Sequence, residues 1–224
     1  MAANQVKVRV WDWTVRTFHW ALALLVCAMW WTAEQGFMGW HKWLGLGLIG
    51  LLVYRLVWGV IGPKSARLFR LVPGPKSLVG YIKTLNDRPY VPAMGHNPLG
   101  GLSVLALLTS LTLQAGSGLF AVDVDGLFSG WFGRYVSFDT GRAFSDFHES
   151  VFNGLIALIT LHVIAIAAYR LILKTNLVGP MLDGQQERPS VPDGHATVHA
   201  SPFRVLIALL IAFAVCWSIF SFGG

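Results

Sequence analysis

The sequence predicts an all-α integral membrane bundle, with a four-helix transmembrane core followed by a fifth, C-terminal transmembrane helix. Hydrophobic residues make up 54% of the 224 residues, charged residues only 12%, and the mean hydropathy is +0.57. Soluble domains carry about 25% charged residues, so this chain has too few to coat a water-facing surface. Five apolar runs are long enough to cross a bilayer, which takes about 20 residues. The same composition excludes a disordered chain.

The first two spans are joined by a short polar hinge. The first runs from about Val15 to Ala33, and the second from about Trp40 to Ile61. Gly62 and Pro63 then end the second span, because both residues interrupt helices. The segment that follows, 64–98, is basic and rich in proline and glycine, as expected of a connecting loop.

Three further spans complete the bundle. The third runs from about Leu99 to Val122, and the polar stretch after it, 123–146, contains no long apolar block. The fourth runs from about Phe147 to Leu173. The last, Phe203–Phe220, is just long enough to span a bilayer.

These boundaries divide the chain into three parts. Residues 1–180 form the predicted four-helix transmembrane domain, and residues 203–224 form the C-terminal helix. The segment between them, 181–202, is polar and contains several prolines and glycines, which predicts a linker.

The net charge of +6 follows the predicted topology. If the N-terminus is cytoplasmic, fourteen of the 17 Lys and Arg residues fall on the inner side, and the outer side keeps only Lys42, Arg134 and Arg142 with six acidic residues. This asymmetry predicts a multi-pass membrane protein with the N-terminus on the cytoplasmic side and the C-terminus on the outer side. It also excludes nucleic acid as a partner, because the basic residues do not cluster with stacking aromatics on a soluble face.

Four of the seven histidines lie in the spans or at their ends, where ionisable residues are costly. His19 begins the first helix on the inner side, and His41 begins the second on the outer side. His148 begins the fourth helix on the outer side, and His162 follows it by fourteen residues. That spacing is about 21 Å of helix and returns the side chain to within about 40° of the same face. The spacing thus predicts an outer pair, His41 with His148, and an inner pair, His19 with His162.

Two opposed imidazoles from different helices are the axial ligands that a six-coordinate haem iron needs, and apolar surroundings suit a porphyrin. We therefore expect two b haems, with His41 and His148 binding one iron and His19 and His162 the other. The chain has no Cys-x-x-Cys-His motif, so both haems would be held without covalent attachment. A single histidine at a helix start can instead be an interfacial anchor, but His162 is deep, and an unpaired buried imidazole is costly.

Two further residues are candidates for contacts with the inner haem. Arg55 follows His41 by fourteen residues on the same helix face, where it could pair with a propionate. Tyr169 follows His162 by seven. Both are equally explained as residues that mark the inner membrane interface. His96 precedes the third span, which carries no partner histidine, so we predict that it is a loop residue.

The histidine pattern is accompanied by other family-specific residues. These are Phe147-His148-Glu149 with Leu161-His162, the string at 54–59 (YRLVWG), and the string at 95–100 (GHNPLG) before the third span. Together with His19 and His41, they resemble the bacterial cytochrome b561 family, which includes the cytochrome b subunits of membrane nickel-iron hydrogenases. The resemblance covers about residues 7–180.

The resemblance implies a four-helix core that holds two b haems, with His19, His41, His148 and His162 as axial ligands. It further implies electron exchange between the quinone pool and a periplasmic redox protein, such as a c-type cytochrome or a hydrogenase. The fifth span departs from the family core. The sequence leaves open whether the protein forms a homodimer.

Bis-histidine ligation leaves no open position on either iron, which favours electron transfer over chemistry at the metal. We therefore predict a transmembrane di-haem b-type cytochrome. One alternative is a self-contained quinol oxidase that reduces superoxide or oxygen. Another is a haem-free transporter that uses intramembrane histidines, although the spans lack buried carboxylate partners and paired half-helices. A structural anchor would not need histidines at two matched depths.

Overall fold

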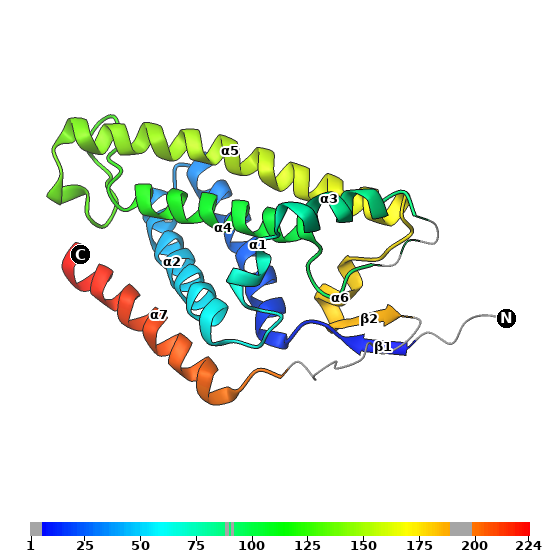
Figure 1. The fold of residues 1–224 in the computed structure, drawn as a ribbon. Coiled ribbons are helices and arrows are strands. Elements are labelled where there is room, and N and C mark those ends of the chain that lie inside the picture. The colour runs from blue at the N-terminus through cyan, green and yellow to red at the C-terminus, as the bar shows by residue number, and fades with distance from the viewer. Residues whose placement is uncertain (1–5, 88–89, 91, 189–198) are drawn as a thin grey trace.

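The computed structural model describes residues 6–87, 90, 92–188 and 199–224. Its five long helices are α1 (Trp13–Glu34), α2 (Met38–Ile61), α4 (Pro98–Gly118), α5 (Phe138–Leu171) and α7 (Pro202–Gly223) (Figure 1). Two shorter helices, α3 (Pro75–Thr84) and α6 (Val178–Asp183), lie in the connections. The remaining elements are the 3-10 turns η1 (Leu68–Leu71) and η2 (Gly133–Tyr135) and the strands β1 (Val6–Arg9) and β2 (Gln185–Arg188).

Side-chain caps fix where the long helices begin. The Asp12 carboxylate accepts a hydrogen bond from the Val15 amide at 2.9 Å, so α1 begins directly after it. Asn97 caps α4 in the same way, by accepting from the Gly100 amide at 2.7 Å. Pro98 is the first residue of α4, a position where its missing amide proton costs nothing.

Among the described residues, four helices are long and apolar enough to cross a membrane: α2, α4, α5 and α7. This finding confirms four of the five predicted spans. The first predicted span coincides with α1, which has 22 residues but is not among the four. Its tryptophans, together with Arg16 and His19, lower its mean hydropathy.

The fourth span is longer than the sequence predicts. Helix α5 begins at Phe138 rather than near Phe147, because the Ser137 hydroxyl caps it by accepting from the Thr140 amide at 3.2 Å. Its 34 residues correspond to about 51 Å, well beyond the roughly 30 Å of a hydrocarbon core. Part of the stretch 123–146, predicted to lie outside the spans, is therefore the first turns of α5.

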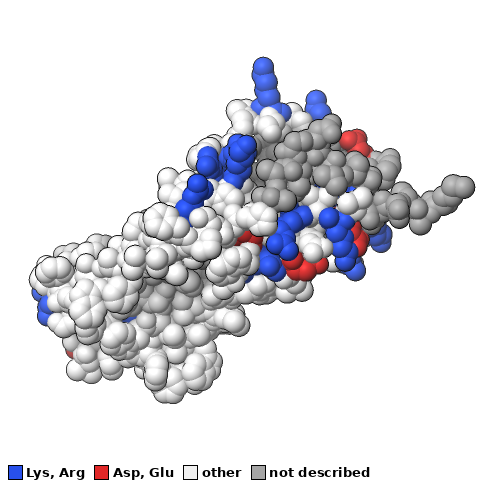
Figure 2. Space-filling view, turned by 90° about the horizontal axis from the view of Figure 1, so that it is seen from below, with Lys and Arg blue, Asp and Glu red and all other residues white. Residues whose placement is uncertain are grey.

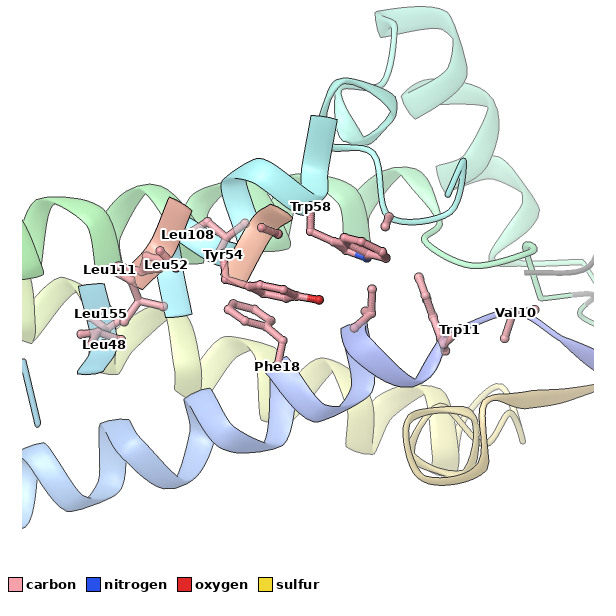
Figure 3. Packing of buried hydrophobic residues seen from close by; sticks show 14 residues of the cluster. Val10, Trp11, Phe18, Leu48, Leu52, Tyr54, Trp58, Leu108, Leu111 and Leu155 are labelled. Carbon is pink, nitrogen blue, oxygen red and sulfur yellow. The ribbon is translucent and has the colours of Figure 1, made fainter. Parts of the chain in front are cut away.

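The long helices pack as two pairs and one added helix. Helix α1 packs against α2 and α4 against α5, while α2 also contacts α4 and α7 (Figure 1). The core between them contains Trp58, Leu48 and Leu155, each almost fully buried. Figure 3 shows Leu48, Leu111 and Leu155 side by side where α2, α4 and α5 meet. Van der Waals packing of this kind holds helices together in a bilayer.

The pairing of α2 with α7 depends on a glycine. A Cβ added to Gly50 would lie 3.1 Å from the Cys216 Sγ, a tight contact, so the glycine favours the close approach of α7 to α2. Cys216 also donates a weak hydrogen bond to the Leu46 carbonyl at 3.5 Å. The two contacts place α7 against the middle of α2.

We expect Gly50→Val to lower the thermal unfolding midpoint of the purified protein, because the added methyl groups force α7 away from α2. Overpacking of this kind costs about 1–3 kcal/mol. Gly39→Val on the same helix is the matched control, since a Cβ at Gly39 meets nothing within 4 Å. Equal midpoints for the two variants would show that α7 does not pack tightly at Gly50.

The structure adds a small sheet that the all-α prediction did not include. Strands β1 and β2 pair antiparallel, with Val6 opposite Arg188 and Arg9 opposite Gln185. The segment 181–202, predicted as a linker, therefore begins with the end of α6 and with β2, and its residues 189–198 lie outside the described part of the chain.

Candidate functional site

The structure brings His41 and His148 together from two different helices. His41 lies in the first turn of α2, and His148 lies in α5, ten residues after its start. Their ring centroids are 6.2 Å apart, with the ring planes at 78°. Both rings line the same cavity, as the predicted outer pair requires.

Backbone carbonyls orient both rings. The Nδ1 of His41 lies 2.9 Å from the Met29 carbonyl oxygen, and the Nδ1 of His148 lies 2.9 Å from the Gln114 carbonyl oxygen. A carbonyl oxygen only accepts, so Nδ1 donates in each case and Nε2 keeps its lone pair. Metal-binding histidines usually have this arrangement, in which the outer hydrogen bond fixes the tautomer and the ring orientation.

The cavity beside these rings has a volume of about 720 Å³. That volume lies within the range of roughly 300–1,000 Å³ found for small-molecule and cofactor sites. Its deeper wall is apolar and is built from four helices, with Val26, Leu48, Leu111, Phe152 and Leu155 among the lining residues. A largely apolar cavity of this volume, with two Nε2 lone pairs available, fits a b haem. Charged residues also line the cavity.

Gly118 leaves the space that the His148 ring occupies. A Cβ added to Gly118, the last residue of α4, would lie 3.0 Å from the Cε1 and 3.2 Å from the Nδ1 of His148. A side chain at this position would therefore press against the ring that the Gln114 carbonyl holds. The position of the His148 ring therefore depends on the small residue Gly118 beside it as well as on His148 itself.

The loop between α4 and α5 forms another wall of the cavity, and α7 holds this loop. Trp131 lines the cavity, and its Nε1 donates to the Lys42 carbonyl at 3.3 Å. Arg134, three residues later, donates to the carbonyls of Phe222 and Gly224 at the end of α7. Helix α7 therefore ends against the segment that closes the outer cavity.

The predicted inner pair also comes from two different helices. His19 lies on α1 and His162 on α5, and no ring contact joins them among the described residues, so their pairing stays a prediction. The Nδ1 of His19 is buried and has no hydrogen-bond partner among the described residues. A buried polar atom without a partner is costly, which is consistent with a role for His19 in binding another group.

One continuous helix carries a histidine of each pair. His148 and His162 are both in α5, so the predicted separation of about 21 Å along the helix applies. Between them, Phe152 lines the outer cavity, Leu155 is buried in the core, and Ile159 packs against that core. The two sites are therefore separated by packed apolar side chains.

Arg55 is buried near the inner pair but has structural contacts of its own. It donates from Nη1 to the Ala66 carbonyl at 3.0 Å, which ties α2 to the loop after it. Its guanidinium carbon lies 6.0 Å from the ring centre of Phe18, the residue before His19. The structure thus places Arg55 at the level of His19, and its contact with a haem stays a prediction.

Tyr169 belongs to a cluster of hydroxyl groups. Its hydroxyl bonds to that of Tyr81 on α3 and accepts from the Asn97 side chain at 3.1 Å, and Tyr81 also bonds to Tyr90 at 2.8 Å. We call Tyr81, Tyr90, Tyr169 and Asn97 the tyrosine cluster. It joins α3, the start of α4 and the end of α5, which sequence spacing could not reveal.

His96 lies in the loop before α4, as predicted. Its ring makes an edge-on contact with the Trp11 ring, with centroids 4.5 Å apart. Burial, and next the charge of Arg55, lower the pKa of His96 to about 4, so it is neutral at pH 7. Within the described residues no three metal-ligating side chains converge, and sites with two histidines each do not require such a group.

A family model described as prokaryotic cytochrome b561 matches residues 10–184, which include α1 to α6 and leave out α7. No curated protein matches the chain, and no solved structure does. The match confirms the resemblance inferred from the histidine pattern. Members of this family bind b-type haem. The chain therefore belongs to the prokaryotic cytochrome b561 family: it is a multi-pass membrane protein and a b-type cytochrome that takes part in electron transfer.

Proposed function

We propose that this protein carries electrons across the bacterial inner membrane through two bis-histidine haems, between the quinone pool and a periplasmic redox partner such as a c-type cytochrome or a hydrogenase subunit. One observation carries the proposal. His41 and His148 share an apolar cavity, and each ring is bound through Nδ1 to a backbone carbonyl, which leaves both Nε2 atoms to bind iron.

The outer site would be held by His41 and His148, and the inner site by His19 and His162. When bound, each haem iron accepts and releases one electron. The backbone carbonyls orient the rings of His41 and His148, apolar side chains would keep water out, and the histidines would supply both protein ligands of each iron. With both positions occupied, electron transfer is favoured over binding of oxygen at the iron. The carbonyl-bound rings also favour ligation over a haem-free transporter, which needs histidines that move protons.

The small sheet supports five spans. Since β1 pairs with β2, the chain must cross the membrane an even number of times between these strands. Helices α2, α4 and α5 supply three crossings, so α1 is needed as the fourth despite its lower mean hydropathy. The contact of Arg134 with the end of α7 likewise requires two crossings, α5 and α7, between these residues.

The charge distribution supports the orientation. Figure 2 shows Lys and Arg gathered toward one end of the molecule, while a long region of the same face carries almost no charge. Lys7 and Arg9 are in β1, at the end where the small sheet lies. Under the positive-inside rule this end faces the cytoplasm, which places the His41 and His148 site on the periplasmic side.

The test is reduction of the protein in proteoliposomes by a lipid-soluble quinol. We expect a haem content of two per chain, b-type bands that appear on reduction, and reoxidation of the haem by a c-type cytochrome added only outside the vesicles. A protein purified without a Soret band would contradict the haem sites. Full haem content without reoxidation by the external acceptor would contradict only the partner and the orientation.

A further inference from the structure

We propose that α3 and the turn before it form a binding surface for anionic phospholipid headgroups at the inner face of the membrane. We call this surface the α3 lipid site, and it consists of Phe69, Arg70, Val72, Lys76, Val79, Ile82 and Lys83. It does not depend on haem or on electron transfer.

Helix α3 presents three distinct faces. At about 100° per residue, Leu78, Tyr81 and Leu85 share one face, and all three are half-buried against the protein. Val79 and Ile82 occupy the next face and are 54% and 48% exposed. The described chain therefore covers one side of α3 and leaves the adjacent apolar side open.

The lysines lie on the far flank of this apolar face. Lys76 and Lys83 are separated by seven residues, so both project from one side of α3 beside Val79, and both are exposed. Within the described residues the one ion pair is Arg142 with Asp146, so neither lysine has an acidic partner. An apolar face with cations along its edge is the pattern of helices that lie in a membrane interface.

The turn before α3 continues the same surface. Phe69 and Val72 are 64% and 65% exposed, and Arg70 between them is also exposed. One basic side chain thus lies between exposed apolar side chains in η1 and the residue after it, and the same two kinds of side chain recur on α3. The cationic charge complements an anionic headgroup, and the apolar side chains complement the acyl region beneath it.

The tyrosine cluster fixes the depth of this surface. Tyr81 on α3 bonds to Tyr169 near the end of α5, and Asn97, the cap of α4, donates to the same Tyr169 hydroxyl. The end of one span and the start of another mark a membrane interface. Helix α3 is therefore held at headgroup level, which favours a lipid over a soluble protein as the occupant.

The test compares the full-length, haem-loaded protein in nanodiscs of phosphatidylcholine alone and of phosphatidylcholine with phosphatidylglycerol. We expect phosphatidylglycerol to raise the thermal unfolding midpoint, and native mass spectrometry to detect retained phosphatidylglycerol. Lys76→Gln/Lys83→Gln should lose most of both effects. The matched control is Lys7→Gln/Arg9→Gln, which removes the same charge from β1 at the same end and should keep both effects.

Two further arms separate the sources of the effect. Inorganic phosphate added to phosphatidylcholine nanodiscs should not raise the midpoint, because it lacks the acyl chains that contact Val79 and Ile82. Val79→Ser/Ile82→Ser should weaken retention of phosphatidylglycerol while leaving haem content at the wild-type value. Equal retention in the α3 and β1 charge variants would overturn the proposal, as would a midpoint that phosphatidylglycerol does not change.

Discussion

His148→Ala is expected to lower the haem content from two per chain to one. The variant removes one of the two imidazoles that we propose as ligands at the outer site and leaves the His41 ring without its partner in the cavity. The inner pair is about 21 Å away along α5 and should keep its haem. Haem content by pyridine haemochrome assay, together with the low-spin signals in electron paramagnetic resonance, measures the loss directly.

The double variant His41→Ala/His148→Ala tests which histidines share an iron. If the pairs are those that we propose, the double variant loses the same haem as each single variant and still keeps one per chain. If the pairing were crossed between the two levels, the double variant would lose both. His96→Ala is the control, because His96 contacts Trp11 in a loop and faces no other histidine among the described residues. It should keep two haems.

Patterns along the chain predicted the four spans that the structure confirms and the placement of His148 and His162 on one helix, because both depend on local properties. An apolar run of about 20 residues has few alternatives to a membrane helix. Fourteen residues of one helix give a rise of about 21 Å and return the side chain to nearly the same face, whatever surrounds the helix. The relative placement of His148 and His162 therefore required only that one continuous helix contain both, and α5 is that helix.

The features that were not predicted depend on contacts between distant segments. Strands β1 and β2 have four residues each and are separated by most of the chain, so neither has a periodicity strong enough to predict it. The start of α5 depends on the Ser137 cap, which lies in a stretch dominated by polar residues. These elements can be recognised only in the folded structure, where the segments that they contact are known.

In the candidate site, too, some features could be predicted from the sequence and others depend on contacts between distant segments. The histidines that we propose as ligands are visible as residue types, but the carbonyl oxygens of Met29 and Gln114 that orient two of them belong to the backbone. Every residue has such an oxygen, so nothing in the sequence distinguishes these two. Gly118 is one of 24 glycines in the chain, and its role follows only from its contact with His148.

Gly118→Val is expected to empty the outer site without removing a ligand. A Cβ at this position lies 3.0 Å from the His148 ring, and the two methyl groups of valine extend further toward it. The ring must then leave its hydrogen bond with the Gln114 carbonyl, which holds Nδ1 at 2.9 Å. Loss of an orienting contact of this kind lowers metal affinity by about 10–100-fold.

Gly116→Val provides the matched control, since a Cβ at Gly116 on the same helix meets nothing within 4 Å. We expect Gly116→Val to keep two haems per chain and Gly118→Val to keep one after extended washing, with the inner haem unchanged in its spectrum. The comparison separates orientation from ligation, because His41 and His148 are both present in each variant. Two firmly bound haems in Gly118→Val would show that the His148 ring binds iron in a position other than the one that Gln114 sets.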